Sequence, residues 1–206
     1  MRFIDIETWD RALHYQIFKD IVQPHYCVTF NLDITNFLPK VKEKGYFFTF
    51  ALIYAICECA DKIENFRYRF VDGKPVVFDT IDTRFTYLNP ETELFKMVAV
   101  PMQDTMEKYA ILAKDTAENQ KEYFPPCPGN NFYQFSMIPW ISFTHISHTD
   151  AGDNKDATPV FNLGKYFEAE GKIMLPFSVK VHHSFVDGVH VGKLAASLQT
   201  YMNRFE

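Results

Sequence analysis

Long hydrophobic runs are missing from this chain of 206 residues. The longest apolar stretch runs from Phe47 to Ala60 and is interrupted by Thr49 and Glu58. It therefore falls short of the roughly 18 to 20 apolar residues that a membrane-spanning helix needs. The first residues, Met1 to Asp5, do not form the apolar region of a signal peptide. We expect a cytoplasmic protein with no membrane partner.

Positive charge is also scarce. Lys and Arg number 21 against 26 Asp and Glu, which gives a formal net charge of -5, and no long basic run occurs. Domains that bind nucleic acid usually carry a basic patch or stripe. The composition therefore argues against nucleic acid as a partner.

Cysteine is rare and scattered. Cys27, Cys57, Cys59 and Cys127 are too few and too widely spaced for a disulfide framework. Cys57 and Cys59 stand two apart in an expected helix, so their side chains face different directions and cannot chelate one metal ion. We expect buried free thiols. None of them is favoured as a catalytic nucleophile.

Aromatic residues, by contrast, are abundant. The chain holds 21 Phe and 11 Tyr, and 47% of its residues are hydrophobic, which is ample for a core and unlike a disordered chain. Most of these rings are expected in the core, although some could line a pocket. No stretch resembles a linker, so we expect one domain over residues 1–206.

Hydrophobic periodicity predicts helices and strands without a regular βαβ alternation. The Asp72-Gly73 pair between alternating segments is a strong hairpin signal. These patterns favour a mixed sheet and the α+β class. Helices are expected at 9–20, between 35 and 45, at 47–63, 103–122 and 189–205, and strands at 27–32, on both sides of the 66–78 hairpin, and at 84–88, 94–100, 131–137, 140–146, 160–163 and 173–181.

One run indicates a possible catalytic site: Val181-His182-His183-Ser184-Phe185-Val186-Asp187-Gly188. Histidine, with an unperturbed pKa of about 6.5, can take and return a proton near neutral pH, which suits a general base for a hydroxyl or thiol. The aspartate could orient this base or fix the loop that carries it. A histidine pair at the end of an apolar strand is also often structural, so the spacing alone leaves both interpretations open.

A second group of candidates concerns metal. His145, His148 and Asp150 could suggest a metal site, but alternation along an expected strand would put the two histidines on opposite faces. We predict no metal.

With the histidine run, the helix after it and the chain length in view, the sequence resembles the chloramphenicol acetyltransferase family over essentially its full length. The strongest segments are residues 181–192, Leu32-Asp33-Ile34-Thr35, Pro139-Trp140-Ile141-Ser142-Phe143, and Pro159-Val160-Phe161 with Gly164-Lys165-Tyr166. Condensation domains of peptide synthetases and acyltransferase domains of dehydrogenase complexes carry related runs, but chain length and the N-terminal match argue against both.

The resemblance implies the CoA-dependent acyltransferase fold, in which helices pack on one side of a two-layer mixed β-sheet. It also implies a homotrimer with active sites at the subunit interfaces and acetyl-CoA as co-substrate. His183 matches the general base, and Ser136 matches the serine that donates to the oxyanion. Asp187 matches a structural aspartate that pairs with an arginine, here Arg11.

Further positions match the binding surfaces of the family. Tyr166, Lys165 and Asn162 fall on the coenzyme side, where Asn162 replaces a threonine and could still hold a water or donate a bond. The acceptor side includes Phe18, Tyr26, Phe95, Gln134 and His148.

Departures from the family pattern concentrate on binding. Phe18 replaces a tyrosine, Gln134 replaces an asparagine, and Phe47 stands where the family tends to have a lysine near the coenzyme. Residues 146–156 are polar and acidic where the family is more apolar. Burying unpaired polar groups against an apolar ligand is costly, so this stretch bears on the choice of acceptor.

The expected function is transfer of acetyl from acetyl-CoA to a hydroxyl of chloramphenicol or a related small molecule, an antibiotic-resistance activity, without a covalent enzyme intermediate. Two alternatives stay open. The acceptor could be another alcohol or an amine, or the chain could be a catalytically silent trimer that binds a small ligand.

Overall fold

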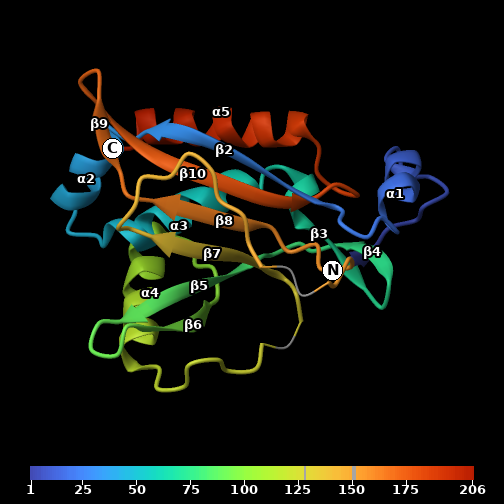
Figure 1. Cartoon of the computed structure of the whole chain (residues 1–206), viewed down its shortest axis with the longest axis horizontal. Helices are drawn as coiled ribbons and strands as arrows, with labels where there is room; N and C mark the ends of the chain where they lie inside the picture. The colour runs from blue at the N-terminus through green and yellow to red at the C-terminus, as the bar shows by residue number, and fades with distance from the viewer. Residues whose placement is uncertain (128, 150–151) are drawn as a thin grey trace.

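The computed structural model describes residues 1–127, 129–149 and 152–206. Its main sheet runs through six strands in the order β2, β10, β8, β7, β5 and β6 (Figure 1), and a short β9 pairs with β10. The pairs β5–β7 and β7–β8 are parallel, whereas the other pairs are antiparallel. The mixed sheet is as predicted. Its strands are β2 (His25–Asp33), β5 (Asp82–Asn89), β6 (Leu94–Val100), β7 (Phe132–Ile138), β8 (Val160–Gly164), β9 (Phe167–Ala169) and β10 (Lys172–His182).

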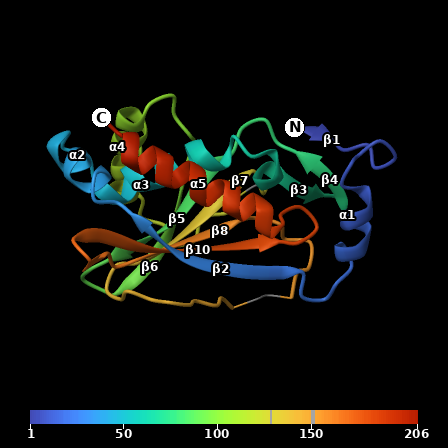
Figure 2. The same ribbon diagram turned by 90° about the horizontal axis from the view of Figure 1, so that it is seen from above.

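Helices α2 to α5 cover one face of this sheet, as Figure 2 shows from above, whereas α1 lies at one end of the molecule. The structure is therefore the expected two-layer α+β arrangement. Strand residues on the covered face, such as Phe135, Phe161 and Phe177, are fully buried. We call the opposite face, which carries Ser136 and Asn162, the open face. The helices are α1 (Ala12–Phe18), α2 (Phe37–Glu43), α3 (Phe48–Ala60), α4 (Met106–Asn119) and α5 (Gly188–Arg204), with a 3₁₀ turn at Glu64–Arg67.

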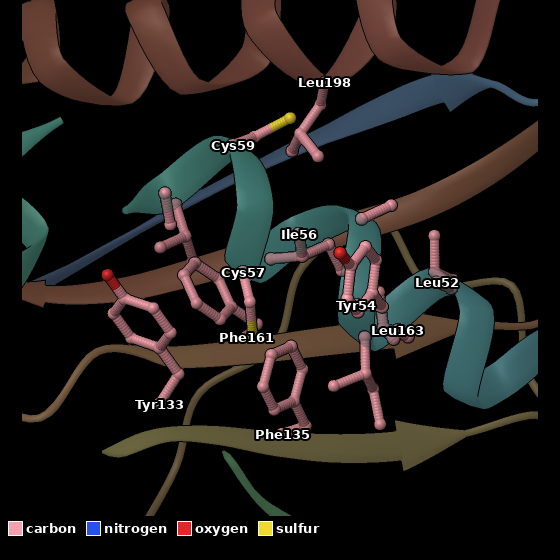
Figure 3. Close-up of a cluster of buried hydrophobic side chains, with 14 of the residues drawn as sticks. Leu52, Tyr54, Ile56, Cys57, Cys59, Tyr133, Phe135, Phe161, Leu163 and Leu198 are labelled. Atoms are coloured by element: carbon pink, nitrogen blue, oxygen red, sulfur yellow. The ribbon is translucent and has the colours of Figure 1, made fainter. Parts of the chain in front are cut away.

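Helix α3 forms the centre of the core. Ten of its 13 residues are buried, so it exposes little beyond Thr49 and Glu58 and shows almost continuous apolar sequence. Figure 3 shows Ile56 and Cys57 of this helix beside Phe135 and Phe161 of the sheet. Dense packing of this kind makes the covered face rigid.

A smaller three-stranded sheet lies at one end of the molecule. It has the order β1 (Arg2–Phe3), β4 (Lys74–Val77) and β3 (Tyr68–Val71). The predicted hairpin is present, because Asp72 and Gly73 both adopt positive φ angles, 50° and 73°, between β3 and β4. Two positive φ angles are what a type I′ turn requires, and an Asp-Gly pair provides them at low cost.

The strand expected at 140–146 is wrong. This segment has no regular secondary structure and instead crosses the open face (Figure 2). Its backbone is tied to the end of β8, where the Lys165 N–H donates to the Ile141 carbonyl at 2.9 Å. The 140–146 segment can approach β8 this closely only because residue 164 is glycine. A Cβ there would lie 3.0 Å from the Phe143 ring and 3.1 Å from the Ile141 oxygen.

We predict that Gly164→Ala lowers the free energy of unfolding by about 1 to 3 kcal/mol, because the added methyl group must displace a ring and a backbone oxygen. Gly192→Ala in α5 is the matched control. No heavy atom lies within 4 Å of its added Cβ, so alanine should stabilise this helix by about 1 kcal/mol. Urea denaturation measures both, and equal stability of the two variants would contradict the packing argument.

Candidate active site

Arg11 joins the N-terminal segment to the junction between β10 and α5. Its Nη1 and Nη2 donate to the two carboxylate oxygens of Asp187 at 2.5 and 2.6 Å. The same guanidinium donates from Nε to the Ser184 carbonyl at 2.7 Å and from Nη2 to the His183 carbonyl at 2.9 Å. The planar fork of arginine permits this bidentate contact. One side chain thus fixes both the carboxylate and the backbone of the 183–187 loop.

Asp187 is held ionised by this contact. The hydrogen bonds from Arg11 lower the pKa of its carboxyl group below the ordinary value, against a smaller opposing effect of burial. Its side chain is 26% exposed and that of Arg11 is 11% exposed, so solvent screens the pair only in part.

His183 also binds Asp187. Its Nδ1 lies 3.1 Å from Asp187 Oδ1. An ionised carboxylate can only accept, so Nδ1 carries the proton and the lone pair of a neutral ring stands on Nε2. The side chain is 38% exposed, which leaves it accessible to a substrate. This is the geometry of a general base oriented by a carboxylate.

Two aromatic rings surround this imidazole. Phe18 stacks on it with a centroid distance of 4.0 Å and an interplanar angle of 8°. The centroid of the Tyr26 ring lies 4.9 Å from that of the imidazole, with the two planes tilted. The Tyr26 hydroxyl donates to the Val186 carbonyl. Burial, and then the charge of Asp187, raise the pKa of Tyr26 to about 12. Tyr26 is therefore a neutral wall rather than a base at physiological pH.

The sequence left two roles open for Asp187, orienting His183 or fixing the loop, and the resemblance implied the pairing with Arg11. The structure shows one carboxylate in contact with both residues. Gly188 is the first residue of α5. His190 was missed: its Nδ1 accepts the Asp187 N–H at 2.9 Å, as a residue at the third helical position does in a capping box. That spacing was the available signal.

His182 is structural. It is the last residue of β10 and is 1% exposed. Its Nδ1 accepts the Ser184 N–H, and its Nε2 lies 2.9 Å from the Asn154 carbonyl. Burial lowers the pKa of His182 to about 4, so the ring is neutral in the fold.

Ser136 lies elsewhere, at a cavity of about 890 Å³ at one edge of the sheet. Phe95 of β6 lines the same cavity. Aromatic and apolar groups dominate its wall. Sequence reasoning missed Lys114 of α4, whose Nζ stands 4.6 Å from the centroid of Phe47, because only the tertiary fold brings α4 to the start of α3.

The remaining predicted residues lie on or near the same side. Asn162 is fully buried, and its Oδ1 lies 2.6 Å from His148 Nε2. Gln134 shares the open face with Ser136, two positions earlier on β7. Tyr166 is 40% exposed with its ring edge against Phe48. The Lys165 carbonyl accepts from Ser142 Oγ at 2.6 Å, which shapes the turn after β8.

The sheet register keeps the two groups of residues apart. Ser136 pairs with Asn162, and Asn162 pairs with Ser178 of β10, which precedes His183 by five residues. At about 3.3 Å per residue along a strand and 4.8 Å between strands, Ser136 and His183 of one chain are roughly 19 Å apart. Figure 1 shows β7 and β10 ending at opposite sides of the sheet. One chain therefore holds the candidate residues around Ser136 apart from those around His183.

Three of the four cysteines are poorly suited to act as thiolates. Burial raises the pKa of Cys27, Cys57 and Cys59, which disfavours the thiolate. Within residues 1–127, 129–149 and 152–206, no group of three His, Cys, Asp or Glu residues is arranged to hold a metal ion. Asp150, named with His145 and His148, lies outside the described residues.

Among the residues that the structure describes, no helix has both the length and the apolar character needed to cross a membrane.

Comparison with known proteins decides the family. The family model described as chloramphenicol acetyltransferase matches residues 1–199. The chain belongs to the chloramphenicol acetyltransferase family. A family member from Proteus mirabilis is 31% identical over 96% of this chain and 93% of its own length.

Solved structures place the fold. A chloramphenicol acetyltransferase superposes with a TM-score of 0.90 at 25% identity, covering 98% of this chain and all of that one. A probable dihydrolipoamide acetyltransferase from Listeria monocytogenes gives a TM-score of 0.67 at 13% identity, covering 95% of this chain and 90% of its own. The fold is therefore that of the CoA-dependent acyltransferases, and the chain is an enzyme of the acyltransferase class.

We predict that Asp187→Asn lowers the free energy of unfolding by about 3 kcal/mol near pH 7, because Arg11 then lacks its counter-charge. The pH dependence of this stabilisation follows from the lowered pKa of Asp187. The stabilisation by Asp187 is present above its pKa in the unfolded chain, about 4, and is lost as pH falls through its lower pKa in the folded protein. The difference from the parent should therefore shrink in acid, as urea denaturation at several pH values would measure.

Asp10→Asn is the control for this substitution, because Asp10 is exposed and adjacent to Arg11. It should leave stability unchanged. Equal stability of Asp187→Asn and the parent at pH 7 would contradict the anchoring role.

Proposed function

We propose that this protein transfers the acetyl group of acetyl-CoA to a hydroxyl of chloramphenicol or a related small molecule. The observation that carries the proposal is the accessible imidazole of His183, with Nδ1 bound by an ionised Asp187 and Nε2 left as a base. Membership of the family supports the reaction, and the relatives named chloramphenicol acetyltransferase support the acceptor. Such acetylation would confer antibiotic resistance.

In the proposed step, His183 Nε2 takes the proton of the acceptor hydroxyl as its oxygen attacks the thioester carbonyl carbon. The new C–O bond forms while the carbonyl electron pair moves onto oxygen, and Ser136 donates a hydrogen bond to that oxyanion. When the pair returns, the C–S bond breaks and CoA leaves as a thiolate. The imidazolium then returns the proton to sulfur. A positioned base of this kind typically contributes about 10² to 10⁴ in rate.

Each site is proposed to form between two copies of the chain. The separation of roughly 19 Å within one chain is too great for Ser136 and His183 to act on the same acetyl group. Two copies that meet with the Ser136 edge of one against the His183 end of the other would complete the site. A cyclic trimer forms such contacts three times and closes. We propose a homotrimer of single-domain chains, 1–206, in the cytoplasm.

The substrates are assigned by the chemistry of the two half-sites. On the coenzyme side, Tyr166 offers an exposed ring for adenine and Lys165 offers a cation for phosphate. For the acceptor, Phe18 and Tyr26 flank the base, while Phe95 and Gln134 belong to the facing half. The part of the 146–156 stretch that is described is largely polar and exposed, which favours testing acceptors more polar than chloramphenicol as well.

The first test is catalysis. The parent should release CoA when given acetyl-CoA and chloramphenicol, and His183→Ala should lower the rate by about 10² to 10⁴, measured with a thiol reagent. A panel of other alcohols and amines separates the reaction from its acceptor. If the parent releases no CoA with chloramphenicol but does so with another acceptor, chloramphenicol is not the acceptor. If the parent releases no more CoA than His183→Ala with any acceptor, the proposed enzymatic activity is wrong.

A second test addresses the shared site. Ser136→Ala and His183→Ala should each be nearly inactive alone, yet unfolding and refolding an equal mixture should restore activity. With random assembly, about a quarter of the interfaces receive an intact Ser136 from one chain and an intact His183 from the other. Refolding each variant by itself is the control. If the mixture stays as inactive as its components, the interfacial site is wrong.

A further inference from the structure

A row of polar side chains crosses the open face of the sheet. Strand register pairs Thr29 with Ser178, Ser178 with Asn162, and Asn162 with Ser136, across β2, β10, β8 and β7. Three of these four residues have a buried polar atom with no hydrogen-bond partner among the described residues: Thr29 Oγ1, Ser178 Oγ and Asn162 Nδ2. Unpaired buried polar atoms destabilise a fold, so each needs an explanation.

Asn162 differs from the other two, because its orientation is fixed. The fully buried amide places Oδ1 2.6 Å from His148 Nε2. An amide oxygen can only accept, so His148 Nε2 carries the proton and donates. This contact turns the amide so that its two N–H donors are left over. The contact thus occupies Nε2 of His148, a residue expected on the acceptor side.

Asn162 also stands next to the proposed oxyanion donor. Ser136 and Asn162 are register partners on parallel strands, about 4.8 Å apart and on the same face. An oxygen atom placed between two such neighbours lies within hydrogen-bond reach of both. Ser136 lines the cavity, so a substrate oxygen can approach it from that side. The Asn162 amide is fully buried and is not part of the cavity wall.

We propose that His148 positions Asn162 so that its free Nδ2–H donates a second hydrogen bond, beside that of Ser136, to the oxyanion of the acetyl group in transfer. The inference rests on the proposed function. Asn162 would then be a catalytic residue and His148 a positioning residue. A preorganised donor left unpaired in the free protein costs stability but needs no reorganisation when the negative charge develops.

The decisive variant is Asn162→Leu, which keeps the approximate size and removes the unpaired donor. It should lower kcat by roughly 10²-fold or more and leave the KM values for acetyl-CoA and acceptor within about two-fold, because a donor to the oxyanion acts only after the ground state. The melting temperature should change little, because removal of the unpaired N–H donors offsets the lost bond to His148, whose partly exposed ring can bind water instead. A structural role for Asn162 would lower the melting temperature instead.

Ser178→Ala is the matched control. Ser178 is equally buried and has an unpaired hydroxyl in the same row, but lies one strand farther from Ser136. Its kcat should match that of the parent. For the positioning residue, His148→Ala should lower kcat by about ten-fold, and His148→Gln, whose amide N–H can donate to Oδ1, should recover part of that loss.

An independent readout is the tautomer of His148, observed from its ring nitrogen shifts by NMR. The proton should reside on Nε2 in the parent and in inactive His183→Ala alike. The inference is wrong if the His148 proton resides on Nδ1 alone. It is also wrong if Asn162→Leu leaves kcat unchanged, with or without a raised KM for acetyl-CoA. In either case the loss of activity in His183→Ala would still support the proposed function. A parent inactive with every acceptor overturns the proposed function, and this inference with it.

Discussion

The ion pair between Arg11 and Asp187 is the interaction on which the candidate site depends. It joins residues 176 positions apart and holds the loop between β10 and α5 by its carbonyls as well as by the carboxylate. Because Asp187 also binds His183, the charge of Arg11 keeps ionised the group that orients the base. An ionised carboxylate at Nδ1 stabilises the imidazolium that forms when Nε2 takes a proton. Fold and chemistry thus share one contact.

The sheet imposes the second constraint. Helices occupy one face, so the polar residues that could act on a substrate are confined to the open face and to the ends of strands (Figure 2). Strand register then sets distances that side chains cannot overcome, and it separates Ser136 from His183 within a chain. Buried polar atoms such as Asn162 Nδ2 are acceptable where a ligand satisfies them.

Local signals in the sequence predicted the elements well where local physics dominates. The Asp72-Gly73 turn, the apolar α3 and the strand Leu94–Val100 depend on backbone preference and hydrophobic pattern. Predictions failed where tertiary contacts decide. The alternating segment 140–146 is not a strand because it packs across Gly164, and strands as short as Arg2–Phe3 and Phe167–Ala169 have too few residues to show a pattern.

The sequence by itself determined the class of fold and the family, because hydrophobic pattern and motifs at fixed spacing carry both. The resemblance to that family, rather than the spacing of the histidine pair alone, then identified His183 as the candidate base. His183, Asp187 and Arg11 could be named in advance. Only the tertiary structure decided that Asp187 serves both its neighbours, that Phe18 covers the imidazole, that His148 binds Asn162, and that the two groups of candidate residues lie apart. Those facts depend on register and on the crossing of the open face, which link residues far apart in the chain and leave no periodic signal.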